Sequence, residues 1–140
     1  MSRPYYAVLV EITTVATILR ISRDSVSDWV DEGHLLHVWN IAEKGARSRV
    51  LRFDYGEVLR LQAGMGQSGE SEEQVIARVI GHPHERSLHT ETVAAMLCTT
   101  RGMVHWWLKS GELAGEDLVG HRQMVSRASL AEFLRGRWVR

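Results

Sequence analysis

The sequence predicts a mainly α-helical fold with two tandem copies of one small unit, each carrying a β-hairpin. Three observations predict it: an internal repeat, apolar residues at helical spacing, and a run of turn-forming residues between the copies. Because many identities in one register indicate duplication, we expect both copies to fold alike. Nine identities at an offset of 78 positions pair Thr14, Val15, Ala16, Leu19, Arg23, Val26, Trp29, Gly33 and Leu35 with Thr92, Val93, Ala94, Leu97, Arg101, Val104, Trp107, Gly111 and Leu113.

Each copy is predicted to begin with two short helices. The second helix starts at an N-cap residue, Ser22 or Thr100, and ends at Gly33 or Gly111. Two short helices joined by a turn of about three residues form a helix-turn-helix. The apolar positions are Val15, Ala16, Ile18 and Leu19, then Val26, Trp29 and Val30, in the first copy, and Val93, Ala94, Met96 and Leu97, then Val104, Trp107 and Leu108, in the second. Their spacing places Trp29 and Trp107 in the core.

A β-hairpin and a closing helix are predicted next in each copy. In the first copy, alternation over 37–41, a Lys44-Gly45 turn and a strand over 49–53 indicate a hairpin with basic residues. Asp54-x-x-Glu57 predicts a capping box for a helix that carries Val58, Leu59 and Leu61. The second copy has a shorter hairpin and a closing helix marked by Leu130, Phe133 and Leu134.

The copies are predicted to span residues 1–62 and 88–140, with a connecting segment over 63–87. Residues 63–73 are rich in glycine, serine and glutamate, as is typical of a linker. Ser71 and Gln74 form a capping-box pattern, which predicts a short helix over 71–80. Its apolar stripe is Val75, Ile76, Val79 and Ile80. This stripe must be buried against one copy, the other copy or a second chain.

The composition is that of an ordinary folded protein. The chain has 140 residues, of which 44% are hydrophobic and 24% are charged, so it can bury a core. No run approaches the roughly 18 apolar residues of a membrane-spanning helix, and we expect no membrane partner. Cys98 is the single cysteine and cannot form an internal disulfide. A reducing cytoplasmic location is therefore expected.

Charge gives only local guidance about partners. Seventeen basic and seventeen acidic residues cancel, which removes the argument for nucleic-acid binding that a strongly basic chain would supply. The net charge is 0 for residues 1–62, −2 for 63–87 and +2 for 88–140. The last segment is therefore the one expected to attract DNA phosphates.

Three further motifs have ordinary structural interpretations. Residues 64–69 fit the dinucleotide-binding pattern G-x-G-x-x-G, but a helix precedes them and glutamates follow, which favours a linker. His82 and His84 lack further ligands at zinc spacing, which favours a turn. Cys98 has no activating base nearby, which favours a small residue packed in a turn. The sequence thus predicts no enzyme, no cofactor and no metal.

Two stretches of the chain resemble the excisionase-like, MerR-type winged helix-turn-helix DNA-binding domains. The matching strings are TTVATILRISRDSVSDWVDEGHL over 13–35 and TETVAAMLCTTRGMVHWWLKSGEL over 90–113, the second closed by HRQMVSRASLAEFLR over 121–135. The second copy matches better. The resemblance implies two tandem winged helix-turn-helix domains, whose second helices enter the major groove while the hairpin wings touch the phosphate backbone or the minor groove.

The resemblance also implies which residues contact DNA. In the two second helices they are Ser22, Arg23, Ser25 and Ser27, then Thr100, Arg101, His105, Trp106 and Lys109. In the wings they are Lys44, Arg47, Arg49 and Arg52, then His121, Arg122 and Arg127. The three arginines of the first wing are expected to share one face of a strand. Arg23 and Arg101, at equivalent positions of the repeat, are expected to contact the groove.

Two departures from the family pattern keep a second function open. The first copy carries Asp24, Asp28, Asp31 and Glu32 on its second helix, where carboxylates oppose phosphates. Trp106, next to the buried Trp107, suits a protein partner as well as a DNA groove.

The expected function is that of a double-stranded DNA-binding protein. It would be a transcriptional regulator or an excisionase-like recombination factor, located on the nucleoid, and a homodimer would also allow two half-sites to be bound. The alternative is a protein-interaction module that binds its partner through the Trp106 face. Within the DNA-binding interpretation, we expect the second copy to supply more of the affinity.

Overall fold

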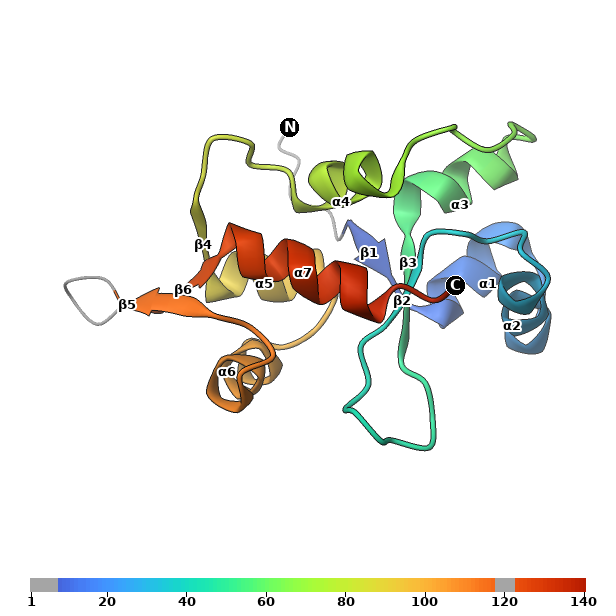
Figure 1. Ribbon diagram of the computed structural model, residues 1–140. Helices are drawn as coiled ribbons and strands as arrows, with labels where there is room; N and C mark the ends of the chain where they lie inside the picture. The colour runs from blue at the N-terminus through green and yellow to red at the C-terminus, as the bar shows by residue number, and fades with distance from the viewer. Residues whose placement is uncertain (1–7, 118–122) are drawn as a thin grey trace.

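The computed structural model describes residues 8–117 and 123–140, which form two halves joined by one helix, α4 (Figure 1). The first half contains β1 (Leu9–Val10), α1 (Ile12–Leu19), α2 (Arg23–Asp31), β2 (Val38–Asn40), β3 (Leu51–Asp54) and α3 (Tyr55–Gln62). Helix α4 spans Glu72–Ile80. The second half contains β4 (Ser87–His89), α5 (Thr90–Met96), α6 (Arg101–Ser110), β5 (Gly115–Asp117), β6 (Gln123–Ser126) and α7 (Arg127–Arg137). The predicted helical character with small antiparallel sheets is confirmed.

The internal repeat is also a structural repeat. Each half has the element order strand, helix, helix, strand, strand, helix, and its three strands are antiparallel in the equivalent orders β1-β3-β2 and β4-β6-β5. The edge strands β1 and β4 were not expected from the sequence, because two or three residues are too few to show an alternating pattern.

The turns between the paired helices have the same backbone geometry in both halves. Arg20 and Cys98, 78 positions apart, adopt left-handed φ values of 57° and 54°. The amide that follows each of them donates back to the preceding helix: Ile21 N to the Ala16 carbonyl at 3.1 Å, and Thr99 N to the Ala94 carbonyl at 2.9 Å. The two turns thus have the same geometry at the repeat offset of 78 positions, which agrees with duplication of the unit.

The helix caps confirm most of the sequence predictions. The hydroxyl oxygens of Ser22 and Thr100 accept hydrogen bonds from Ser25 N at 3.0 Å and Met103 N at 3.1 Å. The capping box at Ser71 is complete. Each satisfied cap contributes about 1 kcal/mol to helix stability.

Helix α3 lacks the predicted capping box. Asp54 does cap it, accepting from Gly56 N at 3.1 Å. Glu57, however, is buried, and its two carboxylate oxygens accept from the amides of Leu36 and His37 at 3.0 Å each. The Glu57 carboxylate therefore accepts hydrogen bonds from the backbone amides that precede β2, and not from the first turn of its own helix.

The two repeated tryptophans differ in burial. Trp107 is 1% exposed and packs against Phe133 of α7, with 4.8 Å between ring centroids. Trp29 is only partly buried and packs against the core of the first half, so its predicted core position is confirmed only in part. The difference follows from the closing helices, because α7 has 11 residues and buries three apolar side chains, whereas α3 has eight and buries one, Val58.

One hydrophobic core extends across both halves. Leu9, Trp39 and Ile41 of the first half belong to the same buried cluster as α4, α7 and the paired helices of the second half. The apolar stripe of α4 is at most 2% exposed, so it is buried within this chain. A smaller second cluster lies between α1, α2, α3 and the first sheet.

Trp138, which follows α7, joins the C-terminal segment to the first half. Its indole lies 4.9 Å from that of Trp39, and its Nε1 donates to the Leu36 carbonyl at 2.8 Å. Val139 N donates to the Val38 carbonyl at 2.8 Å, which extends the pairing along β2. In the part of the chain that is described, no helix has both the length and the apolar character that a bilayer crossing requires.

Replacing Trp138 by alanine is expected to lower the free energy of unfolding by about 2 kcal/mol, because the Trp39 contact and the bond to Leu36 are lost. Chemical denaturation followed by fluorescence measures the change. The control is Trp106→Ala, which removes a tryptophan that is 47% exposed and should alter stability by no more than about 0.5 kcal/mol. Equal effects of the two substitutions would contradict this role for Trp138.

Candidate nucleic-acid interface

Helix α6 presents a polar and basic face to solvent. Val104 and Trp107 are buried, while Arg101, His105, Trp106 and Lys109 are exposed. Thr100 caps the helix, and Gly111, with φ of 89°, ends it. Because positions three and four apart share a helix face, Arg101, His105 and Lys109 form one stripe. The helix carries no acidic residue.

The N-terminal end of α6 borders an open polar pocket of about 420 Å³. Arg101 Nη1 lies 2.9 Å from Oε1 of Glu91 on α5, and both side chains are more than half exposed. His105 Nδ1 lies 3.3 Å from Oε1 of Gln123 at the start of β6. The pocket thus joins α6, the N-terminal turn of α5 and the first residue of β6.

Helix α2 occupies the equivalent place in the first half, but its charge is opposite. Arg23 is exposed at its start, while Ser25 and Ser27 are half-buried. The Ser22 hydroxyl bonds both Ser25 N and Ser25 Oγ, so Ser22 and Ser25 serve the cap. The remaining charged residues of the helix are Asp24, Asp28 and Asp31. This face is therefore acidic overall.

The arginines of the first hairpin do not share a strand face. Strand β3 begins at Leu51, so Arg47 and Arg49 lie in the loop that precedes it. Arg47 is exposed, and Arg49 Nη2 lies 3.7 Å from Oδ1 of Asp31 at the end of α2. The predicted Lys44-Gly45 turn is present, since Ala46 N donates to the Glu43 carbonyl at 3.0 Å, but it lies within a loop of ten residues, 41–50, between the strands.

The predicted phosphate contact of Arg52 is wrong, because this residue is only 8% exposed. Its Nε donates to the Leu97 carbonyl at 3.1 Å, and its Nη2 donates to the Cys98 carbonyl at 2.8 Å. These carbonyls belong to the turn between α5 and α6. Arg52 therefore ties α6 to the first half, a positioning role that the sequence pattern did not indicate.

Residues 118–122, among them the predicted DNA contacts His121 and Arg122, lie outside the described residues. The predicted wing contact of Arg127 is not supported, because its guanidinium donates to the carbonyls of Gly81 and His82 beyond the end of α4. The bond to His82 measures 2.9 Å. Arg127 thus holds α7 against the connecting segment.

Trp106 borders a second open pocket, of about 400 Å³, between α6 and the first hairpin. Lys44 of the hairpin reaches across to the second half, with Nζ 3.3 Å from Oε1 of Glu112. Arg137 pairs with the other oxygen of Glu112 at 2.9 Å. The tip of the first hairpin therefore lies against the C-terminal end of α6.

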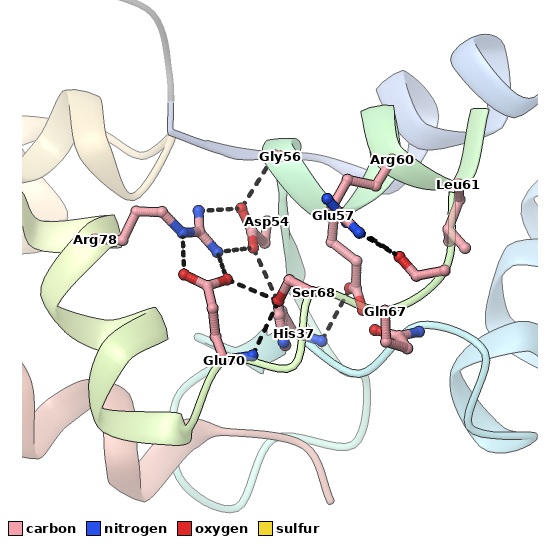
Figure 2. A pocket seen from close by; sticks show the side chains of 11 residues that line it. His37, Asp54, Gly56, Glu57, Arg60, Leu61, Gln67, Ser68, Glu70 and Arg78 are labelled. Carbon is pink, nitrogen blue, oxygen red and sulfur yellow. Dashed lines mark hydrogen bonds and ion pairs between the residues drawn. The ribbon is translucent and has the colours of Figure 1, made fainter. Parts of the chain in front are cut away.

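A buried polar cluster at Asp54 was missed by sequence reasoning (Figure 2). Asp54 accepts from Arg78 Nη2 at 2.7 Å and lies 2.9 Å from His37 Nδ1. Arg78 also binds Glu70, at 2.8 Å from Nε to Oε2. These residues border a pocket of about 380 Å³. Because its charged groups already bind one another, the cluster serves the fold and offers little to a ligand.

The cluster shifts two ionisation equilibria. Burial acts to raise the pKa of Asp54, but hydrogen bonds from His37 and Arg78 outweigh it and lower the pKa to about 2. Burial acts to lower the pKa of His37, yet the hydrogen bond to Asp54 and the charge of Glu57 leave that pKa above 6.5. The charged forms of both residues are favoured in the folded state.

No family model, curated protein or solved structure matches the chain. The function of the chain is therefore inferred from its own residues.

The Asp54 cluster predicts a bell-shaped dependence of stability on pH. The lowered pKa of Asp54 stabilises the fold above pH 3.8, and this contribution is lost as the pH falls toward about 2. The raised pKa of His37 stabilises the fold below pH 6.5, and this contribution is lost as the pH rises through the folded-state value. Urea unfolding across this range measures both limbs.

Asp54→Asn should reduce the free energy of unfolding by about 3 kcal/mol at pH 5, because Arg78 and His37 lose a buried partner. The deficit should shrink toward pH 2. Asp28→Asn, the same exchange at an exposed position, is the control and should leave the pH profile of the parent intact. Parallel pH profiles for Asp54→Asn and the parent would refute the assignment.

Proposed function

We propose that the protein binds double-stranded DNA and that α6 is the helix that enters the major groove. The observation that carries the proposal is the exposed stripe of Arg101, His105 and Lys109 on a helix without carboxylates. A single α-helix fits the major groove, and arginine and lysine are the side chains that most often bind guanine there. The opposite face, with Val104 and Trp107, is buried and would hold the helix rigidly.

The arrangement of each half supports the finer proposal that the chain contains two winged helix-turn-helix domains. In each half a capped second helix follows a short turn, and two strands of a three-stranded sheet and a closing helix come after it. The sequence resemblance to excisionase-like, MerR-type domains agrees with this order. Transcriptional regulation and control of a recombination event both require only such binding, and both fit the proposal.

The charges favour unequal contributions from the two halves. Helix α2 carries three aspartates and one arginine, whereas α6 carries two basic residues and no acidic one. Carboxylates near phosphates oppose binding, while each basic contact releases counterions. The second half therefore supplies most of the DNA affinity in this proposal.

Arg101→Ala in the full chain should weaken binding to a recognised site by about ten-fold, within the range for losing one good base contact. Arg23→Ala, at the equivalent position of α2, should have a smaller effect. Fluorescence anisotropy with labelled duplexes measures both. A larger loss for Arg23→Ala would reverse the assignment of the dominant half.

The recognised site itself is found by capture of sheared genomic DNA at about 50 and 200 mM salt, because salt separates phosphate attraction from base contacts. Sequencing of the retained fragments should reveal a few sites that survive the higher salt. Retention at neither salt would refute the DNA-binding proposal.

A protein-interaction module is the second candidate, favoured by Trp106. This side chain is 47% exposed beside an open pocket that a partner could fill. Exposed tryptophans are enriched among the residues that dominate protein interfaces. Under this candidate, Trp106→Ala abolishes a protein complex, and Arg101→Ala has no effect on it.

A further inference from the structure

We propose that the hairpin of the first half, residues 41–50, is a second DNA-contacting wing for α6 of the second half. The inference rests on the proposed function, because it requires DNA at α6. In Figure 1 the hairpin loop and α6 project from the same side of the molecule, away from α3 and α4. One duplex seated on α6 would then be held by segments from both halves.

Helix α6 has a hairpin on each side of its exposed face. On one side, His105 contacts Gln123, the first residue of β6 in the second hairpin. On the other side, Trp106 borders the pocket that Glu43 and Lys44 of the first hairpin complete. Adjacent helical residues point about 100° apart, so Trp106 faces the first hairpin to one side of the stripe that contains His105.

The first hairpin is held firmly in this place. Arg137 Nη1, at the end of α7, donates to the Ala42 carbonyl at 2.6 Å and to the Asn40 carbonyl at 3.2 Å. Arg52 fixes the other strand of the hairpin to the turn before α6. A wing that is already positioned loses little entropy when DNA binds.

The charge distribution favours α6 over α2 as the partner of this hairpin. The hairpin has Lys44, Arg47 and Arg49 against the single acidic residue Glu43. Helix α6 is also basic, whereas α2, in the same half as the hairpin, has three aspartates. The basic side chains of the hairpin and of α6 therefore act together on a ligand at this face. A duplex is drawn to that surface.

Two side chains of the hairpin are assigned to phosphates. The major groove is about 12 Å wide and bordered by both phosphate strands, so flanking hairpins reach the backbone beside a bound helix. Lys44 is 83% exposed, and Arg47 is exposed at the loop. Glu112, which pairs with Lys44, competes with phosphate for the same ammonium group.

The test measures binding of the full chain to a fluorescein-labelled, mixed-sequence duplex of about two helical turns, between about 50 and 200 mM salt. Replacing both Lys44 and Arg47 by glutamine should weaken binding about ten-fold at the lower salt and reduce the logarithmic salt slope by up to about two. Arg86→Gln, an exposed arginine on the segment between α4 and β4, is the control and should change neither quantity.

Two carboxylate substitutions test whether the first hairpin contacts DNA together with α6 or together with α2. Glu112→Gln keeps a hydrogen-bond acceptor for Arg137 but frees Lys44, and it should tighten binding about two-fold to five-fold. Asp31→Asn frees Arg49 on the α2 side and should leave affinity unchanged. Thermal unfolding verifies that each variant is folded.

Three outcomes overturn the inference. The double variant at Lys44 and Arg47 could keep the affinity and salt slope of the parent while Arg101→Ala still weakens DNA binding. That outcome would refute the second wing and leave the proposed function standing. A larger gain for Asp31→Asn than for Glu112→Gln would assign the hairpin to α2. Absence of binding by the parent chain at the lower salt would refute the proposed function and this inference together.

Discussion

The burial of Trp39 holds the two halves of the chain together. Trp39 lies on β2 of the first half, yet it is fully buried in the core that also contains α4 and Phe133. Burying a tryptophan removes roughly 200 Å² from water, worth about 5 kcal/mol. This exceeds the cost, about 1–3 kcal/mol, of an indole N–H that has no acceptor among the described residues. Separating the halves would expose this surface, so they are expected to unfold together.

Arginines satisfy the polar groups left at this junction. Arg52 and Arg137 donate to backbone carbonyls of the opposite half, and Arg78 binds the buried carboxylate of Asp54. A planar guanidinium with five donors suits such sites, since it can bond several acceptors at once. The consequence is a division among the arginines. Some stabilise the junction between the halves, whereas Arg101 of α6 and Arg47 of the first hairpin are exposed to solvent.

That division gives a neutral chain a polarised surface. The acidic residues of α2 and the basic residues of α6 occupy equivalent places in the repeat, so the two copies have diverged in charge while keeping the same fold. Because phosphate attraction depends on local charge, a net charge of zero is compatible with binding at one face. The fixed junction adds to this by holding the first hairpin beside α6, which turns two similar units into one asymmetric surface.

The sequence by itself determined the helices and the repeat. The caps at Ser22, Thr100 and Ser71 and the helical stripes were predictable because these signals depend on residues only a few positions apart. The exposed residues of α6 were predictable for the same reason. Only the tertiary structure decided that Arg52 is buried, that Glu57 binds the chain entering β2, and that Trp138 packs on Trp39. Each of these contacts joins residues at least 20 positions apart, and local patterns carry no information about which distant carbonyl or ring will be the neighbour.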